Sequence, residues 1–120
     1  MARRGRAQFK IPKNCGETVR CIFNLSAQEF IVLKYLVNAE KGLTINELVR
    51  NTGKHGATIY RVLKMLMEKG LCRRRMECLP HGGYYYRYYA LPVEELKEIV
   101  LKCVDDWYNS VMEKLEKFEF

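Results

Sequence analysis

The chain has 120 residues, of which 48% are hydrophobic and 29% are charged, so it can bury a core as one compact domain. No apolar run approaches the ~18–20 residues that span a bilayer, which argues against a membrane protein. The net charge of +7 is unevenly divided: residues 1–91 carry 17 Lys and Arg against 6 Asp and Glu, a net +11, whereas residues 92–120 carry 4 against 8, a net −4.

Residues 1–13 are expected to form a flexible basic arm with few apolar side chains. Its basic residues are Arg3, Arg4, Arg6, Lys10 and Lys13. The sequence leaves open whether this arm contacts phosphate groups or only adds solubility. A folded domain is predicted to follow over residues 14–91, and a long helix over residues 92–120.

Capping boxes mark the expected starts of three helices, because a polar N-cap residue is followed three positions later by Glu. The pairs are Asn14 and Glu17, Ser26 and Glu29, and Thr44 and Glu47. We expect the second helix to extend to about Ala39 and the third to stop at Asn51-Thr52-Gly53. A fourth helix is predicted over 57–69, with Gly70 as its C-terminal cap and with a core face formed by Ile59, Leu63 and Leu66.

Two runs rich in β-forming residues follow, over 71–78 and 84–91. The segment Leu79-Pro80-His81-Gly82-Gly83 between them predicts a hairpin with a longer loop. Two short helices joined by a tight turn and followed by a hairpin are typical of a winged helix-turn-helix. The predicted fold class is therefore mostly α (α+β), with residues 14–91 as a winged helix-turn-helix DNA-binding domain that has a two-stranded β wing.

Pro92 is predicted to start the last helix, whose apolar side chains recur about every 3.7 residues. These side chains, which we call the apolar stripe, are Leu96, Val100, Cys103, Trp107, Val111, Leu115 and Phe118. So long a stripe exceeds what a small body can cover, and we expect residues 92–120 to form a homodimer with a second copy. A helix that folds back on its own domain is the alternative. A two-fold dimer would set two recognition helices ~34 Å apart, about one turn of DNA.

A body with a net charge of +11 attracts polyanions, of which nucleic acid is the commonest, although charge that serves only solubility is the alternative. In a winged helix-turn-helix the second helix of the pair, here 57–69, enters the major groove, and the wing contacts the backbone or the minor groove. We therefore predict binding to double-stranded DNA. The candidate contacts of the helix and its preceding turn are Lys54, His55, Thr58, Tyr60, Arg61 and Lys64. Those of the wing are Arg73, Arg74, Arg75 and Arg87.

Alternation along the strand places Arg73 and Arg75 on one face of the wing and Arg74 on the other. The second strand also holds five tyrosines, at positions 84, 85, 86, 88 and 89. Cross-strand packing is the favoured interpretation of these rings, and stacking on bases is the alternative. Tyr60 has an alternative role too, in packing against the hairpin.

The sequence also bears on other classes of function. The sequence contains no phosphate-binding glycine loop and no H-E-x-x-H motif, so we do not expect an enzyme. Its five cysteines include no C-x2-C pair, which favours a cytoplasmic protein with reduced thiols and without a metal or other cofactor. A thiol- or metal-responsive sensor stays open, because Cys15 and Cys21 are six residues apart, as are Cys72 and Cys78, and Cys103 lies on the last helix. A winged-helix module that binds protein instead of DNA is a further alternative.

Several segments together resemble the archaeal TrmB-like winged-helix regulators, over roughly residues 15–118. They are Val19-Arg20-Cys21-Ile22-Phe23-Asn24-Leu25-Ser26-Ala27-Gln28-Glu29, Leu43-Thr44-Ile45-Asn46-Glu47-Leu48 with Thr52-Gly53, Ala57-Thr58-Ile59-Tyr60-Arg61-Val62-Leu63-Lys64, Glu68-Lys69-Gly70-Leu71, Gly82-Gly83-Tyr84-Tyr85-Tyr86 and Asp106-Trp107-Tyr108. Each motif is loose and is shared with MarR-like and ArsR-like proteins, so the combination carries the resemblance.

The resemblance implies a sequence-specific, homodimeric transcriptional regulator with Thr58, Tyr60, Arg61 and Lys64 at the matching recognition positions. Lys54-His55-Gly56 stands where relatives often have a Leu-Ser-type cap. Full-length TrmB proteins carry an additional sugar-binding domain that has no counterpart in these 120 residues. We therefore assign no small-molecule ligand.

Overall fold

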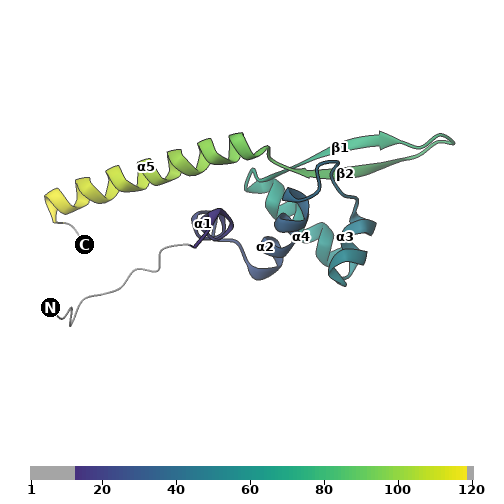
Figure 1. Cartoon of the computed structure of the whole chain (residues 1–120), viewed down its shortest axis with the longest axis horizontal. Coiled ribbons are helices and arrows are strands. Elements are labelled where there is room, and N and C mark those ends of the chain that lie inside the picture. The colour runs from purple at the N-terminus through teal and green to yellow at the C-terminus, as the bar shows by residue number, and fades with distance from the viewer. Residues whose placement is uncertain (1–12, 119–120) are drawn as a thin grey trace.

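The computed structural model describes residues 13–118 and consists of a small helical body from which a hairpin and one long helix project (Figure 1). The body contains α1 (Cys15–Ile22), α2 (Ala27–Val37), α3 (Ile45–Thr52) and α4 (Gly56–Glu68). The antiparallel hairpin, which we call the wing, contains β1 (Cys72–Cys78) and β2 (Tyr84–Ala90), and α5 (Val93–Lys117) follows it. The predicted winged helix-turn-helix is confirmed. The basic arm lies outside the described residues, apart from Lys13.

All three capping signals begin a helix at the predicted place. Full capping boxes form at Ser26 with Glu29 and at Thr44 with Glu47, where side chain and backbone bond reciprocally. Asn14 accepts the N–H of Glu17 at 2.9 Å, but the Glu17 carboxylate accepts the N–H of Lys13 instead of that of Asn14. These local bonds satisfy N–H groups that a helix leaves unpaired in its first turn.

Helix ends differ from the predictions by one or two residues. α2 stops at Val37 rather than at Ala39, because the N–H of Ala39 bonds to the Leu36 carbonyl in a tighter turn, at 3.2 Å. α3 ends at Thr52 and is capped by Gly53, whose φ of 72° is the left-handed conformation that glycine adopts without a steric penalty. α4 begins at Gly56, one residue before the predicted start.

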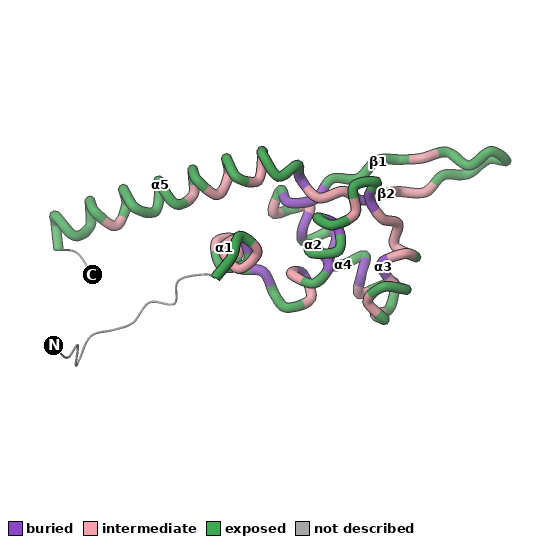
Figure 2. Tube along the Cα trace, viewed as in Figure 1, coloured by how far each residue is buried: buried purple, intermediate pink, exposed green. Residues whose placement is uncertain are grey.

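The core lies where α2, α3 and α4 meet under the base of the wing (Figure 2). Ile59, Leu63 and Leu66 on α4 have no exposed surface, which confirms the predicted core face. Leu48 from α3 is equally buried. Tyr88 of β2 is only 1% exposed and closes the core from the side of the wing. Because α4 buries one face so completely, its opposite face is left to solvent.

A short backbone pairing attaches the wing to the body. Leu43, just before α3, and Tyr88 exchange two hydrogen bonds of 2.9 and 2.8 Å. Gly42 has a φ of 74°, and a Cβ atom there would lie 2.7 Å from the carbonyl oxygen of Tyr88. This close approach requires glycine, so the chain before α3 runs tightly against β2.

The last helix has two parts with different surroundings. Leu96 and Val100, near its beginning, pack against the core, and α5 contacts α1 there. Beyond them the helix runs past the end of α1, where Trp107 lines a pocket together with Ile22, and only then projects away from the body. None of the residues of α5 is buried (Figures 1 and 2). The exposed fraction is 68% for Leu101, 66% for Trp107 and 58% for Leu115. The alternative of a helix folded back along its length on its own domain is therefore wrong.

Glu29 is a buried charge that ties the α1–α2 turn to the end of α4. It is 6% exposed, and its Oε1 accepts the N–H of Ser26 at 2.8 Å and Lys69 Nζ at 3.0 Å. Lys69 Nζ also donates to the carbonyl oxygen of Asn24 at 3.2 Å. Burial alone would raise the pKa of Glu29, but the hydrogen bonds from Ser26 and Lys69 outweigh it and hold the pKa below its ordinary value.

Replacing Glu29 by Gln keeps the size of the side chain and removes the charge that faces Lys69. At pH 7 we expect the variant to lose about 1–3 kcal/mol of the free energy of unfolding, as for a part-buried hydrogen bond to a charged group. Because the folded-state pKa lies below 4.5, the contribution of Glu29 is present above 4.5 and lost as the pH falls. The difference between parent and variant should therefore shrink in acid.

Urea unfolding at one protein concentration, repeated from pH 7 to below pH 4.5, measures the loss of stability and its dependence on pH. The matched control is Glu98→Gln, which removes an exposed carboxylate from α5 and should leave stability unchanged. A Glu29→Gln variant as stable as the parent at pH 7 would contradict the assigned role.

Candidate nucleic-acid interface

The exposed face of α4 combines basic and aromatic side chains. Tyr60 is 50% exposed, and Arg61 and Lys64 are exposed as well. Their spacing places the three on one side of the helix, opposite the core face. Tyr60 is thus presented to solvent over half of its surface. This face has the width and chemistry of a helix that can enter the major groove.

The N-terminus of α4 lacks the side-chain cap that α1, α2 and α3 possess. His55 occupies the N-cap position in an extended conformation, with φ −67° and ψ 151°, and its side chain makes no capping bond. The first turn contains no acidic residue. Lys54 and Thr58 flank this end and are partly buried. Uncapped N–H groups and the positive end of the helix dipole favour a phosphate oxygen at this position.

Arg74 lies beside α4, on the wing face that also carries Tyr88. Its guanidinium carbon is 4.0 Å from the ring centroid of Tyr86. The side chains of Tyr88, and to a smaller extent of Tyr86 and Tyr60, raise the pKa of Arg74. Arg74 of the wing and Tyr60 of α4 are therefore near enough to interact electrostatically, which neither local sequence pattern indicates.

Arg73 and Arg75 lie on the other face of the wing, as the alternation predicted. Arg75 stacks over the ring of Tyr89, with 5.3 Å between the guanidinium carbon and the centroid. Arg73 forms an exposed ion pair of 3.0 Å with Glu95 of α5. The charge of Arg73 is thus partly neutralised. Among the described residues, Arg75 forms no ion pair with a carboxylate.

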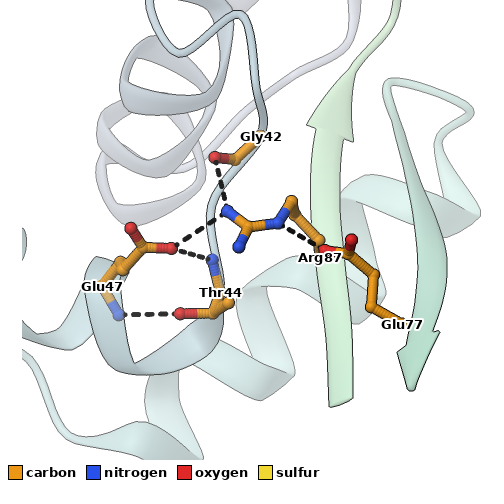
Figure 3. A network of polar contacts seen from close by, with 5 residues as sticks. All are labelled: Gly42, Thr44, Glu47, Glu77 and Arg87. Atoms are coloured by element: carbon orange, nitrogen blue, oxygen red, sulfur yellow. Dashed lines mark hydrogen bonds and ion pairs between the residues drawn. The ribbon is translucent and has the colours of Figure 1, made fainter. Parts of the chain in front are cut away.

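Arg87 is bonded to two carboxylates (Figure 3). Its guanidinium bonds to the carboxylates of Glu77 and Glu47, at 2.6 and 3.3 Å, and these interactions raise its pKa. With two carboxylates beside one guanidinium, the cluster carries no net positive charge for a phosphate to meet. Arg87 therefore does not enter the interface described below. The sequence alone does not identify Glu47 and Glu77 as partners of Arg87, because no local spacing signals contacts across 40 and 10 residues.

The wing tyrosines support arginines and each other. Tyr84 and Tyr86 meet edge to face, with centroids 5.7 Å apart. Arg74 and Arg75 stack over Tyr86 and Tyr89, as described above, and Tyr88 is buried in the core. These contacts agree with the favoured interpretation of the rings as packing residues.

All five cysteines are free thiols. Cys72 is buried, and burial raises the pKa of its thiol to about 12, so it stays protonated at neutral pH. Cys15, Cys21 and Cys78 are exposed. Within residues 13–118, no group of three or more His, Cys, Asp or Glu side chains is arranged to hold a metal ion. In the same part of the chain, no helix has the length and hydropathy to cross a membrane.

Comparison with known proteins gives concordant results. Two uncharacterized proteins of Methanocaldococcus jannaschii are similar in sequence. MJ1503 is 32% identical over 101 residues, covering 83% of this chain and 75% of the relative. MJ1082 is 29% identical over 102 residues, covering 85% of this chain and 83% of the relative.

Two solved structures share the fold. One, from Methanosarcina mazei Go1 and described as a "possible transcriptional regulator", superposes with a TM-score of 0.76 at 25% identity, over 87% of this chain and 88% of that one. The ST1889 protein of Sulfolobus tokodaii gives a TM-score of 0.63 at 25% identity, over 79% of this chain and 92% of that one.

The model of the family described as "Sugar-specific transcriptional regulator TrmB" matches residues 19–94, which include the second half of α1, the whole of α2, α3 and α4, and the whole wing. That description applies to regulators of transcription rather than to enzymes. The chain, with its winged helix-turn-helix and its archaeal relatives, belongs to the TrmB family of transcriptional regulators.

Proposed function

We propose that the protein is a sequence-specific regulator that binds double-stranded DNA as a homodimer, with α4 in the major groove and the wing on the backbone or minor groove. The observation that carries this proposal is the exposed face of Tyr60, Arg61 and Lys64, with Arg74 of the wing beside it. Family membership supports DNA binding in general, and this face supports the specific mode. Such a regulator works in the cytoplasm, where it meets its operator.

Different side chains of this face suit different parts of a duplex. Arg61 projects from the first half of α4 and carries the forked donor that can bond to both acceptors of a guanine edge. Thr58, one turn earlier, can bond to a base edge or to phosphate. Lys64 lies further along and acts as a phosphate contact. Arg74 adds a phosphate contact from the wing, so the two elements address one duplex.

The apolar stripe of α5 supports a homodimer. From Leu101 onward, a broad sector of the helix surface is apolar, and it includes Val104, Trp107, Tyr108 and Leu115. A contiguous apolar surface of this kind is unusual on a monomer and marks a binding surface. A second copy offers the same surface, so a two-fold contact covers both stripes at once. The dimer would present two α4 helices to successive turns of DNA.

Within residues 13–118, no observation specifically favours either alternative. A metal sensor needs a cluster of ligands, and none is found in that part of the chain. Burial raises the pKa of the Cys72 thiol, which makes this thiol unreactive at neutral pH. A module that binds only protein has no need for exposed arginine and lysine on the recognition face. The word "sugar-specific" describes the family, and no small-molecule ligand is assigned to this chain.

Arg61→Ala and Arg74→Ala should separate base recognition from phosphate binding. On a site selected from random duplex DNA, Arg61→Ala should cost about 1–3 kcal/mol of binding free energy and relax the preference at one position. Arg74→Ala should weaken specific and random duplexes alike, and reduce the slope of log K against log salt by about 1. Fluorescence anisotropy at several salt concentrations measures both effects.

Lys102→Ala on the polar side of α5 provides the control for loss of one positive charge, and its binding should match the parent. If both arginine variants bind specific and random DNA like the parent, α4 and the wing are not the reading surface.

Leu115→Glu tests the dimer. Leu115 is 58% exposed, so the substitution leaves the fold of the single subunit intact. We expect the dimer dissociation constant to rise at least about tenfold, because the new carboxylate would lose its hydration in an apolar interface. Asn109→Glu adds the same charge to the polar side of α5 and should leave the dimer unchanged. Sedimentation equilibrium measures the constants, and a parent protein that sediments as a monomer contradicts the proposal.

A further inference from the structure

Arg87 lies in the middle of β2 and joins segments that are far apart in the sequence (Figure 3). Its Nε donates to Glu77 Oε1 of β1 at 2.6 Å. Its Nη1 donates to Glu47 Oε1 of α3 at 3.3 Å and to the carbonyl oxygen of Gly42 at 3.4 Å. Only 24% of the side chain is exposed, although the wing projects into solvent. One guanidinium therefore ties both strands of the wing to the beginning of α3.

The Glu47 oxygen that Arg87 contacts also caps α3. Glu47 Oε1 accepts the N–H of Thr44 at 2.9 Å, and Thr44 Oγ1 accepts the N–H of Glu47 at 3.2 Å. Arg87 is thus anchored to a side chain that is itself held in place. Because α3 packs against α4, a continuous set of contacts leads from the wing through the first turn of α3 to the recognition helix.

The attachment of the wing does not itself depend on Arg87. Leu43 and Tyr88 are paired through two backbone hydrogen bonds, and the Tyr88 ring is buried in the core. Near the base of the wing, β2 also contacts α2, and β1 contacts α4. The Arg87 contacts with Glu47 and Gly42 add side-chain bonds from the wing to the start of α3, beside the Leu43–Tyr88 pairing, and these bonds constrain the angle of the wing. A variant at this position should consequently fold and keep its wing.

The cluster requires an arginine. Arg75 lies directly opposite Arg87 in the strand register, where two like charges repel each other. Glu77 and Glu47 offset this repulsion from two sides. A planar guanidinium can donate in several fixed directions at once, whereas a lysine ammonium would supply the charge without that geometry.

We propose that Arg87 is a positioning residue, which sets the angle between the wing and α4 so that Arg74 and the face of Tyr60, Arg61 and Lys64 reach the same duplex. The inference rests on the proposed DNA-binding function and deepens it. It assigns Arg87 an action through Glu47, Gly42 and Glu77, without contact to DNA.

Arg87→Met and Arg87→Lys test this role through duplex binding. Both should weaken binding about tenfold, the scale of one lost charge-assisted contact, because the wing no longer holds Arg74 on the duplex. In the Arg87→Met background, adding Arg74→Ala should have less than half the effect that it has in the parent. Lys102→Met, which removes a charge elsewhere, is the control. If Arg87→Lys binds like the parent and only Arg87→Met loses affinity, Arg87 contacts phosphate directly and the proposal is overturned. The proposal is also overturned if the losses of binding free energy from Arg87→Met and Arg74→Ala simply add in the double variant.

A measurement without DNA separates this proposal from the proposed function. Residual dipolar couplings of the wing amides report the orientation of the wing relative to the helices. In both Arg87 variants the couplings of β1 and β2 should shrink or change, while those of α2 and α4 stay as in the parent. Unchanged wing couplings would refute the positioning role. If the parent binds no duplex at all, the proposed function fails, and the couplings still decide whether Arg87 sets the angle.

Discussion

The burial of one tyrosine side chain in the middle of β2 organises the wing and its arginines. Tyr88 is 1% exposed, and its backbone pairs with Leu43 at the start of the helix-turn-helix. Successive side chains of a strand point to opposite faces, so a buried Tyr88 directs Arg87 to the other face, toward Glu47. Arg74 is the cross-strand partner of Tyr88, so it lies on the same face of the wing as Tyr88, the face toward α4. A register shifted by one residue would exchange these roles.

The four arginines of the wing divide according to their partners. Arg87 and Arg73 face carboxylates, and the positive charge they would offer to a polyanion is reduced. Arg74 and Arg75 stack over tyrosine rings, which orient the guanidinium without neutralising it. The net charge of residues 1–91 is therefore a poor guide to the binding surface. The identity of each partner matters more than the count of charges.

The two parts of α5 serve different purposes on one continuous helix. Its beginning completes the body, where Leu96 and Val100 cover the core next to α1. In its remainder, Trp107 and Leu115 are exposed. In the proposed homodimer, this part of α5 would set the spacing of the two recognition helices.

Much of the fold follows from signals within three or four residues. Ser26 with Glu29 and Thr44 with Glu47 mark helix starts, and Gly53 marks a helix end, because caps depend only on nearby backbone groups. The stripe of α5 is equally local, since the helix period alone aligns it. The sequence therefore determined the order of elements, the exposed face of α4 and the family resemblance. The tertiary structure alone decided that Arg87 pairs with Glu47 across a separation of 40 residues, that Arg74 lies beside Tyr60, and that Cys72 is buried. Each of these depends on how the strand packs against helices far away in the chain, and no local pattern of residues encodes that contact.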